Sequence, residues 1–208
     1  MTKKKNKNQK TIVIVSVLIT VIMLIIGILF FSNNDKMNRN NNDYTKDLQI
    51  ITNSGNLITT TYKEFDGFNL KIPDEFTIMK QELINLKYPS ENRPSIVYTN
   101  DDGTINVNIK MTDTKLENNK VEETVKQTEN LFKNIDENVE INFFTRNNYN
   151  LGEIKFLSGT IDKTSIYNHM LMFSINGKMT VISFNCLETQ LDEWREVGEF
   201  IIKSIDFN

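Results

Sequence analysis

The chain has 208 residues and a formal net charge of −3, and its charges are unevenly distributed. All 27 acidic residues and 19 of the 24 basic residues follow residue 31, so this later part carries a formal charge of −8. That charge argues against a nucleic-acid-binding domain, which presents a basic surface to phosphates, and against attachment of the later part to an anionic membrane surface.

The cysteine and asparagine contents indicate the kind of host. The single Cys cannot form an internal disulfide, so a domain outside the cell would depend on its core alone. The chain contains 29 Asn and no Ala, a bias that an AT-rich genome imposes through its codons. We therefore predict a bacterial host of low GC content, of the Gram-positive class.

The first 31 residues have the pattern of a membrane anchor. Residues 1–10, MTKKKNKNQK, contain five lysines, and residues 11–31, TIVIVSVLITVIMLIIGILFF, contain no charge. About 20 apolar residues cross a bilayer, whereas the apolar region of a cleaved signal peptide has about 7–15. The lysines predict that the N-terminus stays in the cytoplasm. The alternative is a long signal peptide cut at a poor site, because Leu29 to Phe31 offer no small residue. The anchor and the cleaved signal peptide both place the rest of the chain outside the cytoplasm.

The remaining chain divides into a spacer and one domain. Residues 32–46, SNNDKMNRNNNDYTK, are polar and rich in Asn, which is typical of a flexible spacer. Residues 47–208 are enough for one domain with its own core. We therefore predict a single-pass protein of the cell membrane, with a cytoplasmic segment 1–10, a transmembrane helix 11–31, a spacer 32–46 and an extracytoplasmic domain 47–208.

Alternating apolar residues predict a meander of strands in the first half of this domain. The predicted strands form a hairpin over residues 48–62 that turns at 53–56, a strand over 67–73 (GFNLKIP), a strand over 84–89 (INLKYP), and two strands within 95–111 joined by a turn at 100–103.

Helical spacing appears twice. In residues 118–135 the apolar residues repeat on one face, and Glu122 with Lys126 and Glu129 with Lys133 make i,i+4 pairs on the other. A last helix is predicted to begin at residues 189–192, TQLD, with an acidic variant of a capping box. Its apolar face carries Leu191, Trp194, Ile201 and Ile205, with Trp194 in the core.

The longest strands are predicted between these helices, at residues 140–145, 151–162 and 166–186. Asn176-Gly177 predicts a type I′ turn, which fixes a register. In that register Phe173 lies opposite Thr180, Leu171 opposite Ile182, His169 opposite Phe184, Tyr167 opposite Cys186, Met172 opposite Val181 and Met170 opposite Ser183. Because apolar residues occupy both faces, we expect helices on both faces of the sheet.

The order of these segments resembles the PsbP-like domain family, named for an extrinsic subunit of photosystem II. The resemblance rests on FNLKIP, a central helix, IYNHMLMFSINGKMTVISFNC, a Trp-bearing helix and IIKSIDF, and it covers residues 66–208. The chain departs from the common pattern at Phe76, where a Trp often stands. The resemblance implies an α+β fold, an α/β/α sandwich around an antiparallel sheet, and a non-catalytic accessory or binding role.

No catalytic or metal-binding motif appears in the sequence. His169 and Cys186 are candidates for a base and a nucleophile, but the predicted register leaves their Cβ atoms about 7 Å apart without an orienting third group. We therefore expect both to be structural. With one His and one Cys, a transition-metal site would need mostly carboxylates, and the sequence locates none. We predict no catalytic, cofactor-binding or metal-binding residue, and no cofactor.

Three functions fit these observations. The first is a membrane-anchored binding or accessory protein of a bacterial envelope, whose partner is another envelope protein or an apolar small ligand. The second is an envelope sensor or a protective, immunity-type protein. The third and weakest is a hydrolase that depends on carboxylates. The sequence does not identify the residues that bind a partner.

Overall fold

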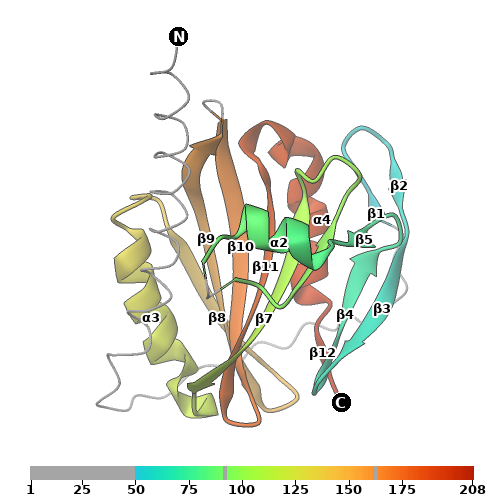
Figure 1. Ribbon diagram of the computed structural model, residues 1–208. Helices are drawn as coiled ribbons and strands as arrows, with labels where there is room; N and C mark the ends of the chain where they lie inside the picture. Colours follow the sequence, from blue (N-terminus) through green and yellow to red (C-terminus); the bar gives the residue numbers. More distant parts are fainter. Residues whose placement is uncertain (1–49, 91–92, 162–163) are drawn as a thin grey trace.

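The computed structural model describes residues 50–90, 93–161 and 164–208, and within them a mixed α+β fold with antiparallel sheets and three α-helices (Figure 1). The central sheet has seven strands in the order β5-β6-β7-β11-β10-β9-β8. Its strands are β5 (Thr77–Ile78), β6 (Ile96–Thr99), β7 (Asn106–Lys115), β8 (Glu140–Arg146), β9 (Tyr149–Ile161), β10 (Thr164–Ile175) and β11 (Lys178–Leu187).

Helices cover both faces of this sheet, as the sequence predicted. Helix α3 (Val121–Phe132) lies on one face against β8, β9 and β10, and α2 (Gln81–Lys87) lies in front of the same face in Figure 1. Helix α4 (Leu191–Lys203) lies on the opposite face against β10 and β11. Short 3-10 turns precede two of the helices, at Asn118–Lys120 and Glu188–Gln190.

The β10–β11 hairpin confirms the predicted register at every pair. Asn176 and Gly177 have φ angles of +52° and +73°, as a type I′ turn requires. His169 pairs with Phe184 and Tyr167 pairs with Cys186. This one turn therefore determines which side chains of the two central strands face α4 and which face α3.

The GFNLKIP strand does not continue the central sheet, so the prediction of one meander is wrong at this point. Strand β4 (Phe68–Pro73) instead lies between β3 (Thr60–Phe65) and β12 (Asp206–Phe207) in a separate three-stranded sheet. The pairing of Asp206 with Asn69 joins residues that are far apart in sequence, which local alternation cannot reveal. A smaller hairpin, β1 (Ile50–Ile51) with β2 (Leu57–Ile58), precedes this sheet and turns over residues 52–56.

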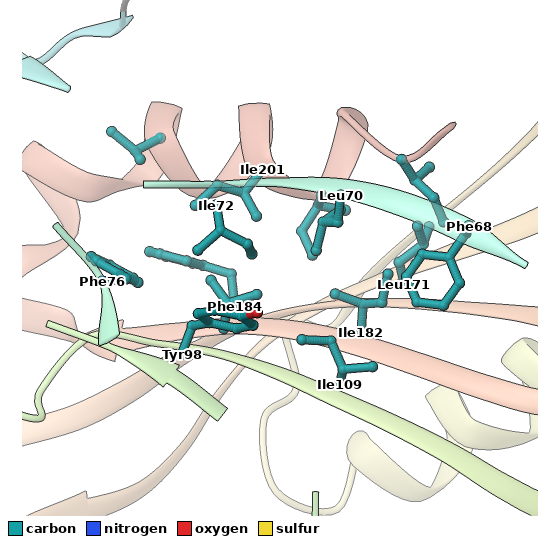
Figure 2. Close-up of a cluster of buried hydrophobic side chains, with 14 of the residues drawn as sticks. Phe68, Leu70, Ile72, Phe76, Tyr98, Ile109, Leu171, Ile182, Phe184 and Ile201 are labelled. Atoms are coloured by element: carbon teal, nitrogen blue, oxygen red, sulfur yellow. The ribbon is translucent and has the colours of Figure 1, made fainter. Parts of the chain in front are cut away.

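The three-stranded sheet packs beside α4 over the central sheet and encloses the larger core. Phe68, Leu70 and Ile72 of β4 are each 0% exposed. Figure 2 shows apolar side chains between the central sheet and β4, among them Tyr98, Ile109, Leu171, Ile182 and Phe184, and Ile201 of α4 packs against the same core. A second core lies under α3, where the rings of Phe132 and Phe156 are 4.2 Å apart.

Two local predictions are wrong. Residues 84–87 of the INLKYP segment are helical and belong to α2, which buries Ile84 in a small apolar cluster while Leu83 and Leu86 face outward. Alternation over six residues does not distinguish this spacing from a strand. Helix α4 has no capping box at 189–192. Its N-cap is Gln190, whose side chain accepts a hydrogen bond from the Leu187 N–H at 3.2 Å.

The helical ion pairs are confirmed. Lys126 contacts Glu122 at 2.6 Å and Lys133 contacts Glu129 at 2.8 Å. The predicted segments 1–10, 11–31 and 32–46 lie outside the described residues. Among the helices that the structure does describe, none combines the length and apolar character of a membrane span.

Candidate functional site

His169 and Cys186 share one face of the sheet, as the register predicted, and α4 covers that face; the hydrogen-bond partner of the imidazole is Glu153 and not Cys186. Cys186 is 0% exposed, and burial raises the pKa of its thiol to about 12, with the positive charge of Arg195 opposing this only in part. The thiol is therefore protonated at neutral pH. His169 donates to or accepts from Glu153 instead, with 3.0 Å between Nε2 and Oε1.

We expect Cys186 to be unreactive while the domain is folded. A thiol-specific disulfide reagent should label the native protein at least ~100-fold more slowly than the protein in denaturant, because only exposed thiolates react. Since the chain has one Cys, full labelling corresponds to one equivalent. Equal rates with and without denaturant would show that Cys186 is exposed in the folded state.

Glu153 and His169 form a buried pair between β9 and β10. The two side chains are 2% and 0% exposed, and the Asn142 amide donates a second hydrogen bond to Glu153 Oε2 at 3.0 Å. Burial by itself would raise the pKa of Glu153. The hydrogen bonds from His169 and Asn142, together with the positive charges of His169 and Lys203, outweigh burial and lower that pKa to about 2.

Helix α4 adds a second carboxylate to this pair. Glu199 contacts Lys155 of β9 and, at 3.2 Å, Lys203 one turn later on α4. Burial opposes ionisation of Glu199, but the Lys155 hydrogen bond and the neighbouring positive charges lower its pKa overall. One ligand atom each from Glu153, His169 and Glu199 lie within 4.8 Å of one another, a set that could hold a metal ion. We call these three residues with Lys155 and Lys203 the charged cluster.

A cavity of about 470 Å³ opens elsewhere, between β3, β5, β6 and α2. Its walls are mostly apolar or aromatic, with Phe65, Met79, Ile84, Ile96 and Tyr98 inside and Ile78, Glu64, Lys80, Gln81 and Ser95 nearer the solvent. We call this space the edge cavity. Residues of two separate apolar clusters line the edge cavity. Tyr98 belongs to the large core, and Met79 and Ile84 belong to a small cluster under α2.

Exposed apolar side chains flank the edge cavity along the chain. Ile78 at its mouth is 63% exposed, and Leu83 and Leu86 of α2 are 53% and 77% exposed. Large apolar residues with this exposure mark a surface suited to contact with another molecule when they occur close together.

No family model and no curated protein matches the chain. Among solved structures, the cyanobacterial PsbP protein (CyanoP) of Synechocystis superposes with a TM-score of 0.51 at 9% identity, covering 76% of this chain and 94% of CyanoP. The chain has a PsbP-like fold. LpqN, involved in cell envelope biogenesis of Mycobacterium tuberculosis, matches the chain with a TM-score of 0.45 at 12% identity, covering 73% of the chain and 91% of LpqN.

Phe76, where the sequence departs from the common pattern of the family that it resembles, is part of the core. Phe76 is buried, and its ring lies 5.6 Å from that of Trp194 on α4. Trp194 packs against the large core, which confirms the predicted role of this residue. A Phe at position 76 therefore still joins the connection between β4 and β5 to α4 through an aromatic contact.

Sequence reasoning missed Glu153 and Glu199 as members of the charged cluster. A signal for Glu153 was present, because Leu151, Glu153, Lys155 and Leu157 alternate on one face of a strand that is covered on both sides. Two charges on a covered face indicate a buried pair. Glu199 had no comparable signal, since its neighbours on β9 and β10 are set by tertiary packing.

Proposed function

We propose that this protein is a non-catalytic binding or accessory protein, and that the edge cavity receives an apolar side chain or small apolar ligand. The observation that supports this is the cavity itself, since about 300–1,000 Å³ with apolar walls and a few polar groups is typical of ligand sites. The exposed Ile78 at its mouth would be buried on binding.

We further propose that the domain acts outside the cytoplasm, attached to the cell membrane. The support is the uncharged apolar segment 11–31 after five lysines, and the polar spacer 32–46 that would hold the domain away from the bilayer. A partner in the bacterial envelope fits this location.

The experiment is cross-linking in intact cells that express the tagged full chain, followed by identification of captured molecules. We expect Ile78→Glu to reduce capture at least tenfold. Burying one Ile side chain stabilises a complex by about 1.5–3 kcal/mol, and about 1.4 kcal/mol corresponds to a tenfold change.

Ile51→Glu is the matched control. Ile51 is 66% exposed, close to the 63% of Ile78, and it lies on β1 outside the cavity lining. Capture should be unchanged in this variant. Equal losses in both variants, or a native protein purified in mild detergent after cross-linking as a monomer without partner or ligand, would contradict the proposal.

A further inference from the structure

Two buried polar atoms beside the charged cluster have no hydrogen-bond partner within the described part of the chain. They are the Tyr167 hydroxyl and Nδ1 of His169, in residues that are 5% and 0% exposed. Both side chains lie on the α4 face of β10, two positions apart. Burial and the negative charge of Glu199 raise the pKa of the Tyr167 hydroxyl. Buried polar atoms are almost always bonded to protein, water or an ion, so both atoms need a partner that the described protein groups do not supply.

The neighbouring side chains supply ligands of the kind that zinc binds. Zn²⁺ is held by His nitrogen and carboxylate oxygen at about 2.0–2.2 Å, usually in a tetrahedron, which places neighbouring ligand atoms about 3.3 Å apart. His169 Nε2 and Glu153 Oε1 are 3.0 Å apart, and the Glu199 ligand atom completes a set within 4.8 Å. Small movements of these side chains would bring all three into bonding distance of one ion.

Charge balance and access also permit an ion. Lys155 and Lys203 together place two positive charges beside Glu199. A divalent cation carries the same charge, so it can replace both ammonium groups without leaving the carboxylates uncompensated. The side chains of Lys155, Lys203 and Glu199 are 22%, 31% and 27% exposed, so the lysines can turn into solvent and the Glu199 side of the cluster offers an entry route.

We propose that Glu153, His169 and Glu199 bind one divalent transition-metal ion of the zinc class, in exchange for the ammonium groups of Lys155 and Lys203. The ion ties β9, β10 and α4 together, whereas the Lys155–Glu199 pair joins only β9 to α4. Water is available for the remaining coordination positions. This metal site is separate from the edge cavity, and neither proposal depends on the other.

The test is a titration of the full chain, purified in mild detergent and freed of metal with a chelator, with CoCl₂ and then ZnCl₂. We expect one ion per chain, visible absorption from bound Co²⁺ that Zn²⁺ abolishes, and a higher Tm with Zn²⁺. The chain has a single His, so an imidazole-nitrogen signal that changes on metal addition belongs to His169. His169→Gln and Glu199→Gln should each weaken binding at least tenfold.

Lys155→Gln separates a metal site from a purely structural ion-pair cluster. It removes a competitor for Glu199 and should tighten Zn²⁺ binding several-fold, whereas a cluster without a metal role gives no change. Glu122→Gln, which alters a helix-surface carboxylate paired with Lys126, should leave binding unchanged. Binding that persists in His169→Gln, no binding by the unaltered chain, or no tightening in Lys155→Gln would overturn the proposal; the last two tests apply even if His169→Gln does not fold.

Discussion

Gly198→Ala is expected to destabilise the folded domain by about 2–3 kcal/mol and to lower its Tm by about 5–10 °C. On an exposed helix the same change stabilises by about 1 kcal/mol, because Gly is the poorer helix former. Here α4 lies so close to β11 that a Cβ at position 198 would come within 2.6 Å of Phe184 Cε1. Phe184 is 0% exposed, so its ring has no free space to move into. Thermal and chemical unfolding measure the effect.

Glu196→Ala is the matched control on the same helix. Glu196 is exposed, and its replacement should change the free energy of unfolding by no more than about 0.5 kcal/mol. Adding Phe184→Leu to Gly198→Ala should relieve part of the clash, so the double variant should be less destabilised than the two single effects together. A Tm for Gly198→Ala at or above that of the unaltered protein would show that α4 and β11 are not in close contact.

Glu153→Gln is expected to cost roughly 3 kcal/mol of stability at neutral pH. The amide keeps the size of the side chain but removes the charge that the hydrogen bonds from His169 and Asn142 stabilise inside the protein. Glu122→Gln provides the comparison, because Glu122 also has a cationic partner but lies on the helix surface, where a pair contributes about 0.5 kcal/mol or less. Equal effects of the two substitutions would contradict a special role for the buried carboxylate.

The same carboxylate predicts how stability depends on pH. The pKa of Glu153 is about 2 in the folded protein against 4.5 as the ordinary value, so the unfolded chain binds the extra proton first as the pH falls. The contribution of Glu153 is therefore fully present above about pH 5 and is lost progressively between pH 5 and pH 2. Denaturant unfolding at several pH values, with a chelator present, should show the difference between the unaltered protein and Glu153→Gln shrinking over this window. A constant difference would argue against the low pKa.

The sequence was sufficient to predict strand register and helix position where a short local feature determined the structure of a long element. Asn176-Gly177 set the register of β10 and β11, and with it the orientation of His169 and Cys186 toward α4. The period of apolar residues located α3 and α4, and apolar residues on both faces of the β10–β11 hairpin predicted helices on both faces of the sheet, as did the resemblance to PsbP-like domains.

The parts that sequence reasoning missed depend on contacts between distant segments. Residues 84–89 carry apolar side chains at alternate positions and at helical spacing alike, and only the packing of Ile84 decides for a helix. The charged cluster joins residues of β9, β10 and α4, so its third member, Glu199, could be placed only once α4 was packed on the sheet. The edge cavity is likewise a property of packing between two sheets and α2, with no motif in the sequence.

The pairing of β12 with β4 has a consequence for biosynthesis. Asp206 pairs with Asn69, which is made 137 residues earlier, and Phe207 stacks on Tyr149 at 4.1 Å. At about 5–20 residues per second, roughly 7–30 s pass between synthesis of the two strands. During that time one edge of β4 lacks its partner, and an uncovered strand edge can pair with other chains. During this interval the exposed edge of β4 makes the nascent domain most prone to aggregation, and a chaperone that covers this edge would have its largest effect.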